Sequence, residues 1–336
     1  MINKLQNLRR RDFCRLALIS GYTTIYGCTK GINNPIFLST SESIPKEWLR
    51  ELPSPWSHTV LKEKNLDSDN NLNKYYQNAD LISIGDGWLQ RINNEDFNDI
   101  YSGAFSSKLN KKAKEFIGSW RNSIQSKILP IGFSPWVMIF RNGEKWSVEA
   151  SKDWSVLLDN ELKGKIIFPR SPRLMISIAK RIGGSNTLRN LRRQALAFDD
   201  RNGLNWISSG KAKVAVLPLS RCFDSLMIDP RLNIAFPING APLNWTLLLS
   251  PAKTKEPLPQ EWLAKSLTKP LLSLMLARGW TPPIDYMNLS GAMNLVPTKY
   301  QSTILPPSYI LDRCWSFGEL NTKEKYDLEE EWRIAS

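Results

Sequence analysis

Short apolar runs alternate with helix-type patterns along this chain, and this alternation restricts the possible folds more than any other feature of the sequence. Residues 164–169 form one apolar run, and the apolar residues of 174–182 then recur on a single helical face. Between them, Ser171 offers an N-cap hydroxyl and Pro172 suits the first helical position. Residues 213–218 form a further strand-type run. Strands that alternate with helices usually pair in parallel, so the sequence predicts an α/β fold.

An earlier apolar run gives the first indication of a binding site. Residues 79–85 predict a buried parallel strand, which ends in a tight turn at Gly85-Asp86-Gly87. Ligands of open parallel sheets bind at the carboxyl ends of strands, which predicts that Asp86 and Trp88 meet a ligand. The alternative is that Asp86 only caps the next helix and that Trp88 packs in the core.

The remaining pattern completes the predicted order of elements. Pro135 separates two extended stretches, and their position predicts a crossover between two lobes. A run near residue 246 predicts the return crossing, and Pro270 is expected to bend a long helix. The predicted elements are a loop over 57–73, a helix over 110–126, extended stretches over 127–134 and 136–141, a helix over 187–198, strands over 232–237 and 244–249, and helices over 260–278 and 323–333.

The N-terminus has the order of an export signal. Arg10 and Arg11 precede the apolar stretch Leu16–Ile25, which leads to Cys28. The stretch is far shorter than the roughly 20 residues of a membrane-spanning helix, so residues 1–27 are predicted to be a removable leader. The arginine pair resembles the leader of the twin-arginine pathway, which exports folded proteins. The alternative, a basic amphipathic helix of a cytosolic protein, fits poorly because the apolar residues are contiguous.

The end of the leader also resembles a lipoprotein box, which implies acylation of Cys28. Tyr26 is larger than the residue that such a box usually has two places before its cysteine. Acylation would tether the mature chain to the membrane on its periplasmic side.

Composition and charge leave room for a nucleic-acid partner but give it little support. The 336 residues are enough for two lobes with cores, and the net charge is +13. The leader carries five basic residues and one acidic residue, so the rest of the chain keeps a charge of +9. The basic residues are dispersed, with a local cluster at Arg189–Arg193, and no nucleic-acid-binding motif is present. We therefore predict no nucleic-acid partner and keep such a protein as an alternative.

Cysteine and histidine usage argues against metal sites and common catalytic arrangements. Cys222 and Cys314 are the two cysteines beyond the leader and Cys28, and they lack the spacing of a zinc site. His58 is the only histidine, which disfavours a Ser-His-Asp triad. We predict free thiols, no metal, no cofactor and no enzymatic activity, with an enzyme on the same scaffold as the alternative.

The order of these segments resembles a bacterial extracellular solute-binding protein of an ABC transporter. The similarity is to the spermidine/putrescine-binding branch, which has the type II periplasmic-binding-protein fold. That fold has two lobes, each a mostly parallel sheet flanked by helices, joined by a hinge of two crossing segments. The segments that carry the resemblance are residues 79–88, 162–173, 209–215 and 236–252.

The resemblance also implies domain boundaries and partners. One lobe would comprise residues 31–135 and 243–320, the other residues 136–242, and residues 321–336 would form a C-terminal helix. Such a protein is a periplasmic monomer that closes over a small solute and delivers it to a membrane permease.

The polyamine recognition set of that branch is largely missing here. In that branch, carboxylates pair with the ammonium groups of the ligand. The corresponding positions of this chain hold Ser171, Leu174 and Thr246, none of which is acidic. The aromatic residue that stacks on the ligand falls near Pro218. The resemblance therefore implies a solute-binding protein with a different specificity, with a degenerate or repurposed binder as the alternative.

Nearby arginines suggest an anionic solute. Arg173 or Arg221 could hold a carboxylate, sulfonate or phosphate, for which a guanidinium fork is suited. The alternative is that Arg173 lies on the surface and that Arg221 pairs with Asp224. The predicted ligand-binding residues are Asp86, Trp88, Trp136, Ser171, Arg173, Arg221, Asn244, Trp245 and Thr246.

Overall fold

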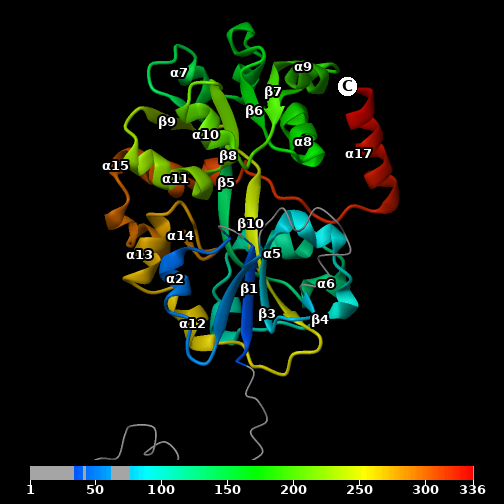
Figure 1. Cartoon of the computed structure of the whole chain (residues 1–336), viewed down its shortest axis with the longest axis vertical. Helices are drawn as coiled ribbons and strands as arrows, with labels where there is room; N and C mark the ends of the chain where they lie inside the picture. Colours follow the sequence, from blue (N-terminus) through cyan, green and yellow to red (C-terminus); the bar gives the residue numbers. More distant parts are fainter. Residues whose placement is uncertain (1–33, 41–42, 62–75, 336) are drawn as a thin grey trace, which may run out of the picture. The chain divides into compact units, whose positions relative to one another are not determined.

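A single mixed β-sheet runs through the computed structural model, which describes residues 34–40, 43–61 and 76–335 (Figure 1). The predicted leader and Cys28 lie outside the described residues. The strands are β1 (Ile36–Thr40), β2 (Ser57–Leu61), β3 (Leu81–Gly85), β4 (Phe97–Asn98), β5 (Leu129–Arg141), β6 (Ile166–Phe168), β7 (Ala195–Phe198), β8 (Val214–Pro218), β9 (Leu232–Ala235) and β10 (Leu243–Pro251).

The sheet consists of two blocks that share β5. Its order is β2-β1-β3-β10-β5-β8-β6-β7, with β4 beside β10 and β9 beside β5. In the first block β1 is parallel to β2 and β3, while β10 is antiparallel to β3 and β5. In the second block β6 is parallel to β7 and β8, while β5 is antiparallel to β8 and β9. The predicted mixture of parallel strands and helices is confirmed.

Strand β5 crosses from one block to the other without a break. Its residues 129–135 pair with β10, and Trp136 begins the pairing with β8. The prediction of two stretches separated at Pro135 is therefore wrong. Pro135 lies where the strand changes partner, and a missing backbone N–H is tolerated at such an end of a ladder.

Helices cover the sheet, and α8 shows how local signals set their limits. The Ser171 hydroxyl accepts a hydrogen bond from Leu174 N, Pro172 occupies the first turn, and Gly183 ends the helix with φ of 86°. The helices and 3-10 turns are α2 (Lys46–Leu49), η2 (Asp86–Arg91), η3 (Asn94–Asp96), α4 (Gly103–Ser106), α5 (Lys111–Gly118), α6 (Asn122–Gln125), α7 (Ser147–Ala150), η4 (Trp154–Leu158), η5 (Asn160–Leu162), α8 (Pro172–Ile182), α9 (Thr187–Gln194), α10 (Gly203–Ser208), α11 (Leu219–Ile228), α12 (Gln260–Lys265), α13 (Leu271–Leu276), α14 (Tyr286–Ser290), η6 (Met293–Leu295), α15 (Thr298–Ile304), α16 (Ser308–Leu311) and α17 (Thr322–Ile334).

Four predicted elements differ from the structure. The helix over 187–198 stops at Gln194, because the next four residues pair with β6 as strand β7. The helix over 260–278 is two helices, since Pro270 cannot continue a helix and instead caps α13. The helix over 110–126 is interrupted after Gly118. Part of the predicted loop, Ser57–Leu61, is strand β2 beside β1.

Paired tryptophans hold the helices of the first block. Trp48 Nε1 donates to Trp262 O at 3.0 Å, and Trp262 Nε1 donates to Trp48 O at 2.9 Å. The two rings stack with centroids 4.5 Å apart, and both side chains are almost fully buried. Each indole N–H has a hydrogen-bond acceptor. Burial of these large rings therefore holds α2 against α12 and leaves neither N–H group without a partner.

The C-terminal segment connects the first block to the second. Glu319 forms an ion pair with Arg121, which lies between α5 and α6. Helix α17 then packs against α8, where Lys180 Nζ lies 3.0 Å from Glu331 Oε2 (Figure 1). Arg192 also lies over the Trp332 ring, 4.0 Å from its centroid. This segment therefore links the blocks in addition to β5 and the chain that leads from β9 into β10.

Both described cysteines are buried free thiols. Cys222 lies on α11 and Cys314 follows α16. Burial raises the pKa of Cys222 to about 12 and that of Cys314 to about 11, which leaves little thiolate at neutral pH. We expect the two cysteines of a chain that starts at residue 29 to resist a thiol reagent while the chain is folded. When the chain is denatured without reductant, both cysteines should react with the reagent. Detection of fewer than two would contradict the assignment.

Candidate functional site

A cavity of about 500 Å³ lies where strand ends of the two blocks meet. Thr40 ends β1, Gly85 ends β3 and Pro218 ends β8, so carboxyl ends of strands form its wall. This is the place where open α/β sheets bind ligands. From the first block it is lined by Thr40, Ser43, Gly85, Gly87, Trp88, Arg91, Asn244 and Thr246, and from the second by Trp136, Pro169, Arg170, Ser171, Pro172, Asp200, Arg201, Pro218, Ser220 and Arg221.

The charged residues of the lining are mostly basic. Four arginines and one carboxylate, Asp200, border the cavity. Arg221 Nη1 donates to Asp200 Oδ2 at 2.8 Å, and Arg170 N donates to Asp200 Oδ1 at 3.4 Å. On the opposite wall, the Arg91 guanidinium lies over the Trp88 ring, 5.2 Å from its centroid. Among the described residues of the lining, arginines therefore outnumber carboxylates, and Asp200 already accepts hydrogen bonds from Arg221 and from the backbone of Arg170.

The structure brings six of the nine predicted residues together at this cavity. They are Trp88, Trp136, Ser171, Arg221, Asn244 and Thr246. The alternative pairing of Arg221 with Asp224 is wrong, because Arg221 contacts Asp200 while Asp224 accepts a hydrogen bond from Arg278 at 2.7 Å.

The other three predicted residues lie behind the cavity wall. Asp86 Oδ1 accepts a hydrogen bond from Trp245 N at 3.2 Å, and the Trp245 indole donates to Ser316 Oγ at 2.8 Å. Arg173 Nη2 donates to Gly318 O at 2.7 Å and does not line the cavity. Asp86, Arg173 and Trp245 are therefore not among the residues that line the cavity, and their contact with a ligand stays a prediction.

Burial shifts the pKa values of Asp86 and Arg173, which lie behind the cavity wall. It raises the pKa of Asp86 to about 7, while backbone hydrogen bonds and the positive charge of Arg173 act in the opposite direction. Burial likewise lowers the pKa of Arg173, which the charge of Asp86 partly offsets. Asp86 therefore titrates near neutral pH without direct access to the cavity.

Three positions at which the family resemblance implies recognition residues line this cavity without an acidic group. They are Ser171, Thr246 and Pro218. The fourth, Leu174, is 2% exposed and belongs to the core of the second block. The cavity thus lacks acidic residues at the positions where an ammonium group would require them.

Sequence reasoning missed several lining residues. Asp200 and Arg201 follow β7, which had been predicted as the end of a helix. Arg91 ends η2, while Thr40 and Ser43 lie at and beyond the end of β1. A polar residue at the carboxyl end of a strand is the signal that could have identified Thr40.

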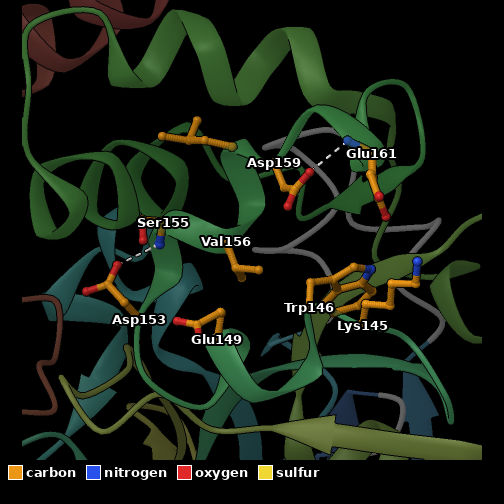
Figure 2. A pocket seen from close by; sticks show the side chains of 9 residues that line it. Lys145, Trp146, Glu149, Asp153, Ser155, Val156, Asp159 and Glu161 are labelled. Atoms are coloured by element: carbon orange, nitrogen blue, oxygen red, sulfur yellow. Dashed lines mark hydrogen bonds between the residues drawn. The ribbon is translucent and has the colours of Figure 1, made fainter.

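A second cavity, of about 560 Å³, lies within the second block and is acidic (Figure 2). Two of its carboxylates have local structural roles. Asp153 accepts a hydrogen bond from Ser155 N at 2.6 Å, and Asp159 accepts one from Glu161 N at 2.8 Å. These bonds cap the 3-10 turns η4 and η5. Within the described residues, no group of three or more His, Cys, Asp or Glu side chains is arranged to hold a metal ion.

A serine–histidine contact lies away from both cavities. Ser39 Oγ is 2.8 Å from His58 Nε2, on neighbouring strands β1 and β2. Ser39 is only 2% exposed, and neither residue lines a described cavity. A buried hydroxyl in this position cannot reach a substrate, so the contact gives no support to a nucleophilic mechanism.

Solved structures show what this architecture is similar to, although no family model and no curated protein matches the chain. The spermidine/putrescine ABC transporter substrate-binding protein PotD from Streptococcus pneumoniae superposes with a TM-score of 0.64 at 12% identity, over 90% of this chain and 98% of that one. The ferric binding protein from Campylobacter jejuni gives 0.57 at 14% identity, over 90% and 99%. An ABC transporter protein from Rhodopseudomonas palustris gives 0.59 at 11% identity, over 89% and 99%.

The chain has the fold of the type II periplasmic binding proteins. The predicted fold class is thereby confirmed. Within the described residues, no helix of this type II fold is both long and apolar enough to cross a membrane.

Proposed function

We propose that the chain is the solute-binding component of an ABC transporter. It captures a small molecule in the cavity between two lobes and delivers it to a membrane permease. One observation carries this proposal: the cavity lies where the strand ends of both blocks converge, beside the crossing strands β5 and β10. In a type II fold this position allows a hinge motion to enclose a ligand.

We assign the two lobes to the ranges that the sequence resemblance implies. Residues 31–135 and 243–320 form one lobe and residues 136–242 form the other, while α17 follows as the C-terminal helix. The lining of the cavity supports this division, because it draws on both ranges. The protein acts as a monomer and needs no cofactor.

The leader places the protein outside the cytoplasm. Export through the twin-arginine pathway and acylation of Cys28 would hold it at the periplasmic face of the membrane, close to its permease. Mass spectrometry of the mature N-terminus tests this part: a diacylglyceryl-modified Cys28 supports the tether, and an unmodified N-terminus elsewhere contradicts it.

Neither polyamine nor iron is favoured as the solute. A polyamine needs several carboxylates, and in the described part of the chain the cavity lining has one, which is paired with Arg221. A ferric ion is a hard cation that prefers oxygen ligands, yet the lining residues that the structure describes include no tyrosine, no histidine and a single carboxylate. The solute therefore differs from those named for the similar structures.

Capture can be tested through closure of the lobes. Protein purified under native conditions is expected to retain a small molecule, which mass spectrometry identifies. Removing that molecule by unfolding and refolding should increase the radius of gyration in X-ray scattering, and adding it back should restore the smaller value. The refolded protein without ligand is the control. A radius that does not respond to the ligand would contradict capture by hinge closure, and a chemically converted ligand would favour an enzyme.

A further inference from the structure

We infer that the C-terminal segment, residues 313–335, is a strap that controls how the lobes open. The second lobe pivots about α11, and the cavity opens on its other flank, where Glu319 of the strap has to leave Arg121 of the first lobe. Helix α17 stays on the second lobe and moves with it. This inference rests on the proposed function, because it concerns the closure of that same cavity.

On one flank of the cavity, α11 of the second lobe packs into the core of the first lobe. Its first turn lines the cavity through Ser220 and Arg221. Farther along the helix, Phe223 is fully buried and contacts Tyr300 of the first lobe, with ring centroids 5.5 Å apart. Gly279 approaches so closely that an added Cβ would lie 3.0 Å from Phe223 Cβ. Separating these surfaces would expose buried apolar area to water, so this flank is expected to stay together.

A shared guanidinium also ties α11 to the first lobe. Arg278 Nη1 lies 2.7 Å from Asp224 Oδ1 on α11, and Arg278 Nη2 lies 2.6 Å from Glu47 Oε1 on α2. One cation thus binds carboxylates of both lobes, which adds charge-assisted hydrogen bonds to the apolar packing. The α11 flank therefore has the properties of a pivot.

The other flank is joined by polar contacts to a single peptide of the strap. Figure 1 shows α11 to the left of the central strands and α8 and α17 to their right. On this right-hand flank, Gly318 O accepts hydrogen bonds from Gln90 Nε2 of η2 at 3.4 Å and from Arg173 Nη2 of α8 at 2.7 Å. Gln90 lies between two residues that line the cavity, and Arg173 directly follows two others. The strap therefore joins the two walls of the cavity from behind.

After Gly318 the strap returns to the first lobe through a contact that we call the clasp. The Glu319 carboxylate pairs with the Arg121 guanidinium and accepts a hydrogen bond from Arg121 N at 3.0 Å. Glu319 N donates to Ser119 O at 3.1 Å. The Arg121 side chain is 46% exposed, and exposed ion pairs contribute little to stability because water and salt screen them. The clasp is therefore the contact that opening breaks first.

Helix α17 is held on the second lobe by a cradle of basic residues on α8 and α9. Residues 171–198 include six basic residues and no acidic residue. Five of the six contact the strap: Arg173, Lys180, Arg181, Arg189 and Arg192. Arg192 lies over the Trp332 ring, which also meets the Phe198 ring edge-on at 5.5 Å. Cation–π and apolar contacts together outweigh the single exposed ion pair of the clasp, so α17 should travel with the second lobe.

Electron–electron double resonance between pairs of spin labels measures this opening in a chain that starts at residue 29 and holds no ligand. Labels on cysteines at the exposed positions Lys114 and Arg193 report the clasp flank, and labels at Asn288 and Ile228 report the α11 flank. Labels at Lys325 and Arg193 report the distance from α17 to the second lobe. The two native cysteines are buried and should not take a label.

Removing the charge of the clasp should favour the open state. Glu319→Gln is expected to raise the ratio of open to closed molecules about two- to fivefold, as the loss of an exposed ion pair implies. The clasp-flank distance should lengthen, and the other two distances should stay the same. The matched control is Glu330→Gln, because that carboxylate pairs with Arg333 inside α17 and not with the other lobe. Exchanging the charges, with Arg121→Glu and Glu319→Arg together, should restore most of the closed population.

A second variant separates the strap from the first lobe by shape instead of charge. Gly318→Ala adds a Cβ that would lie 2.6 Å from Ser119 O, so the strap has to move away from the first lobe. This variant should also lengthen the clasp-flank distance. In the unsubstituted protein, added salt should have the same effect, because it screens the clasp, and it should have little effect on Glu319→Gln.

The outcomes separate this inference from the proposed function. An unchanged clasp-flank distance in both Glu319→Gln and Gly318→Ala overturns the strap. A longer α11-flank distance overturns the pivot, and a longer distance from α17 to the second lobe overturns the assignment of α17 to the moving lobe. Adding the molecule recovered from natively purified protein then tests capture: if it does not shorten the clasp-flank distance, closure around a solute fails and the results on the strap stand. Circular dichroism of each variant verifies its folding.

Discussion

Replacing Asp86 by asparagine is expected to remove a large loss of stability that the protein undergoes as pH rises from about 4 to about 7. Burial raises the pKa of this carboxyl from 3.8 to about 7 in the folded state. A raised folded pKa means that its contribution to stability is complete below pH 3.8 and is lost as pH rises to about 7. The shift corresponds to at most about 4 kcal/mol.

The asparagine variant keeps the local hydrogen bond but has no charge to bury. Its side-chain oxygen can still accept from Trp245 N, which lies 3.2 Å from Asp86 Oδ1. Urea unfolding of both proteins near pH 4 and pH 8 measures the difference, and the variant should be the more stable protein at the higher pH. The control is Asp99→Asn, since Asp99 is an exposed carboxylate whose pKa is lowered by its bond with Ser126. If the Asp86 variant were less stable than the parent at pH 8, the carboxylate would be stabilising.

Replacing Gly132 by alanine is expected to destabilise the fold by about 3 kcal/mol. Gly132 lies within the crossing strand β5, opposite Thr246 of β10. A methyl group on its Cα would overlap the indole ring of Trp280. Trp280 is 2% exposed and packed within the first-block core, so the ring cannot move aside without disturbing its neighbours.

Gly118→Ala is the matched control, because the same change there should have the opposite effect. Gly118 is the last residue of α5, it is exposed, and an added Cβ meets nothing within 4 Å. Alanine costs less conformational entropy in a helix, so a gain of about 0.5 kcal/mol is expected. Thermal and urea unfolding measure both variants. Equal stability of the Gly132 variant and the parent would show that the tryptophan can repack.

Elements with complete local signals could be predicted from the sequence, and elements decided by distant partners could not. Helix α8 has its capping serine, its proline, its apolar face and its terminal glycine within one stretch of sequence. Residues 195–198 have good helix formers and no such stop signal, and they form a strand because β6 lies beside them. That error hid Asp200, which follows the strand and reaches the cavity.

In the candidate site, too, some features follow from local sequence signals and others depend on distant contacts. The strand end at Gly85 could be placed at the cavity from the pattern of apolar runs, and the family resemblance placed Thr246 and Pro218 near the ligand. Side chains alternate along a strand, so Trp245 points away from the face that presents Asn244 and Thr246. Whether a residue lines the cavity or supports its wall depends on this direction, and for Arg173 it depends on Gly318, a residue far away in the chain.

The position of β10 has a consequence for the order in which the protein can fold. Strand β10 lies between β3 and β5, although it is the last of the described strands along the chain. The first block therefore cannot close before residue 251 has been synthesised, whereas β5 to β9 are already complete at residue 235. A ribosome-bound chain that stops between these points is expected to expose the facing edges of β3 and β5, and long-range pairing of this kind slows folding.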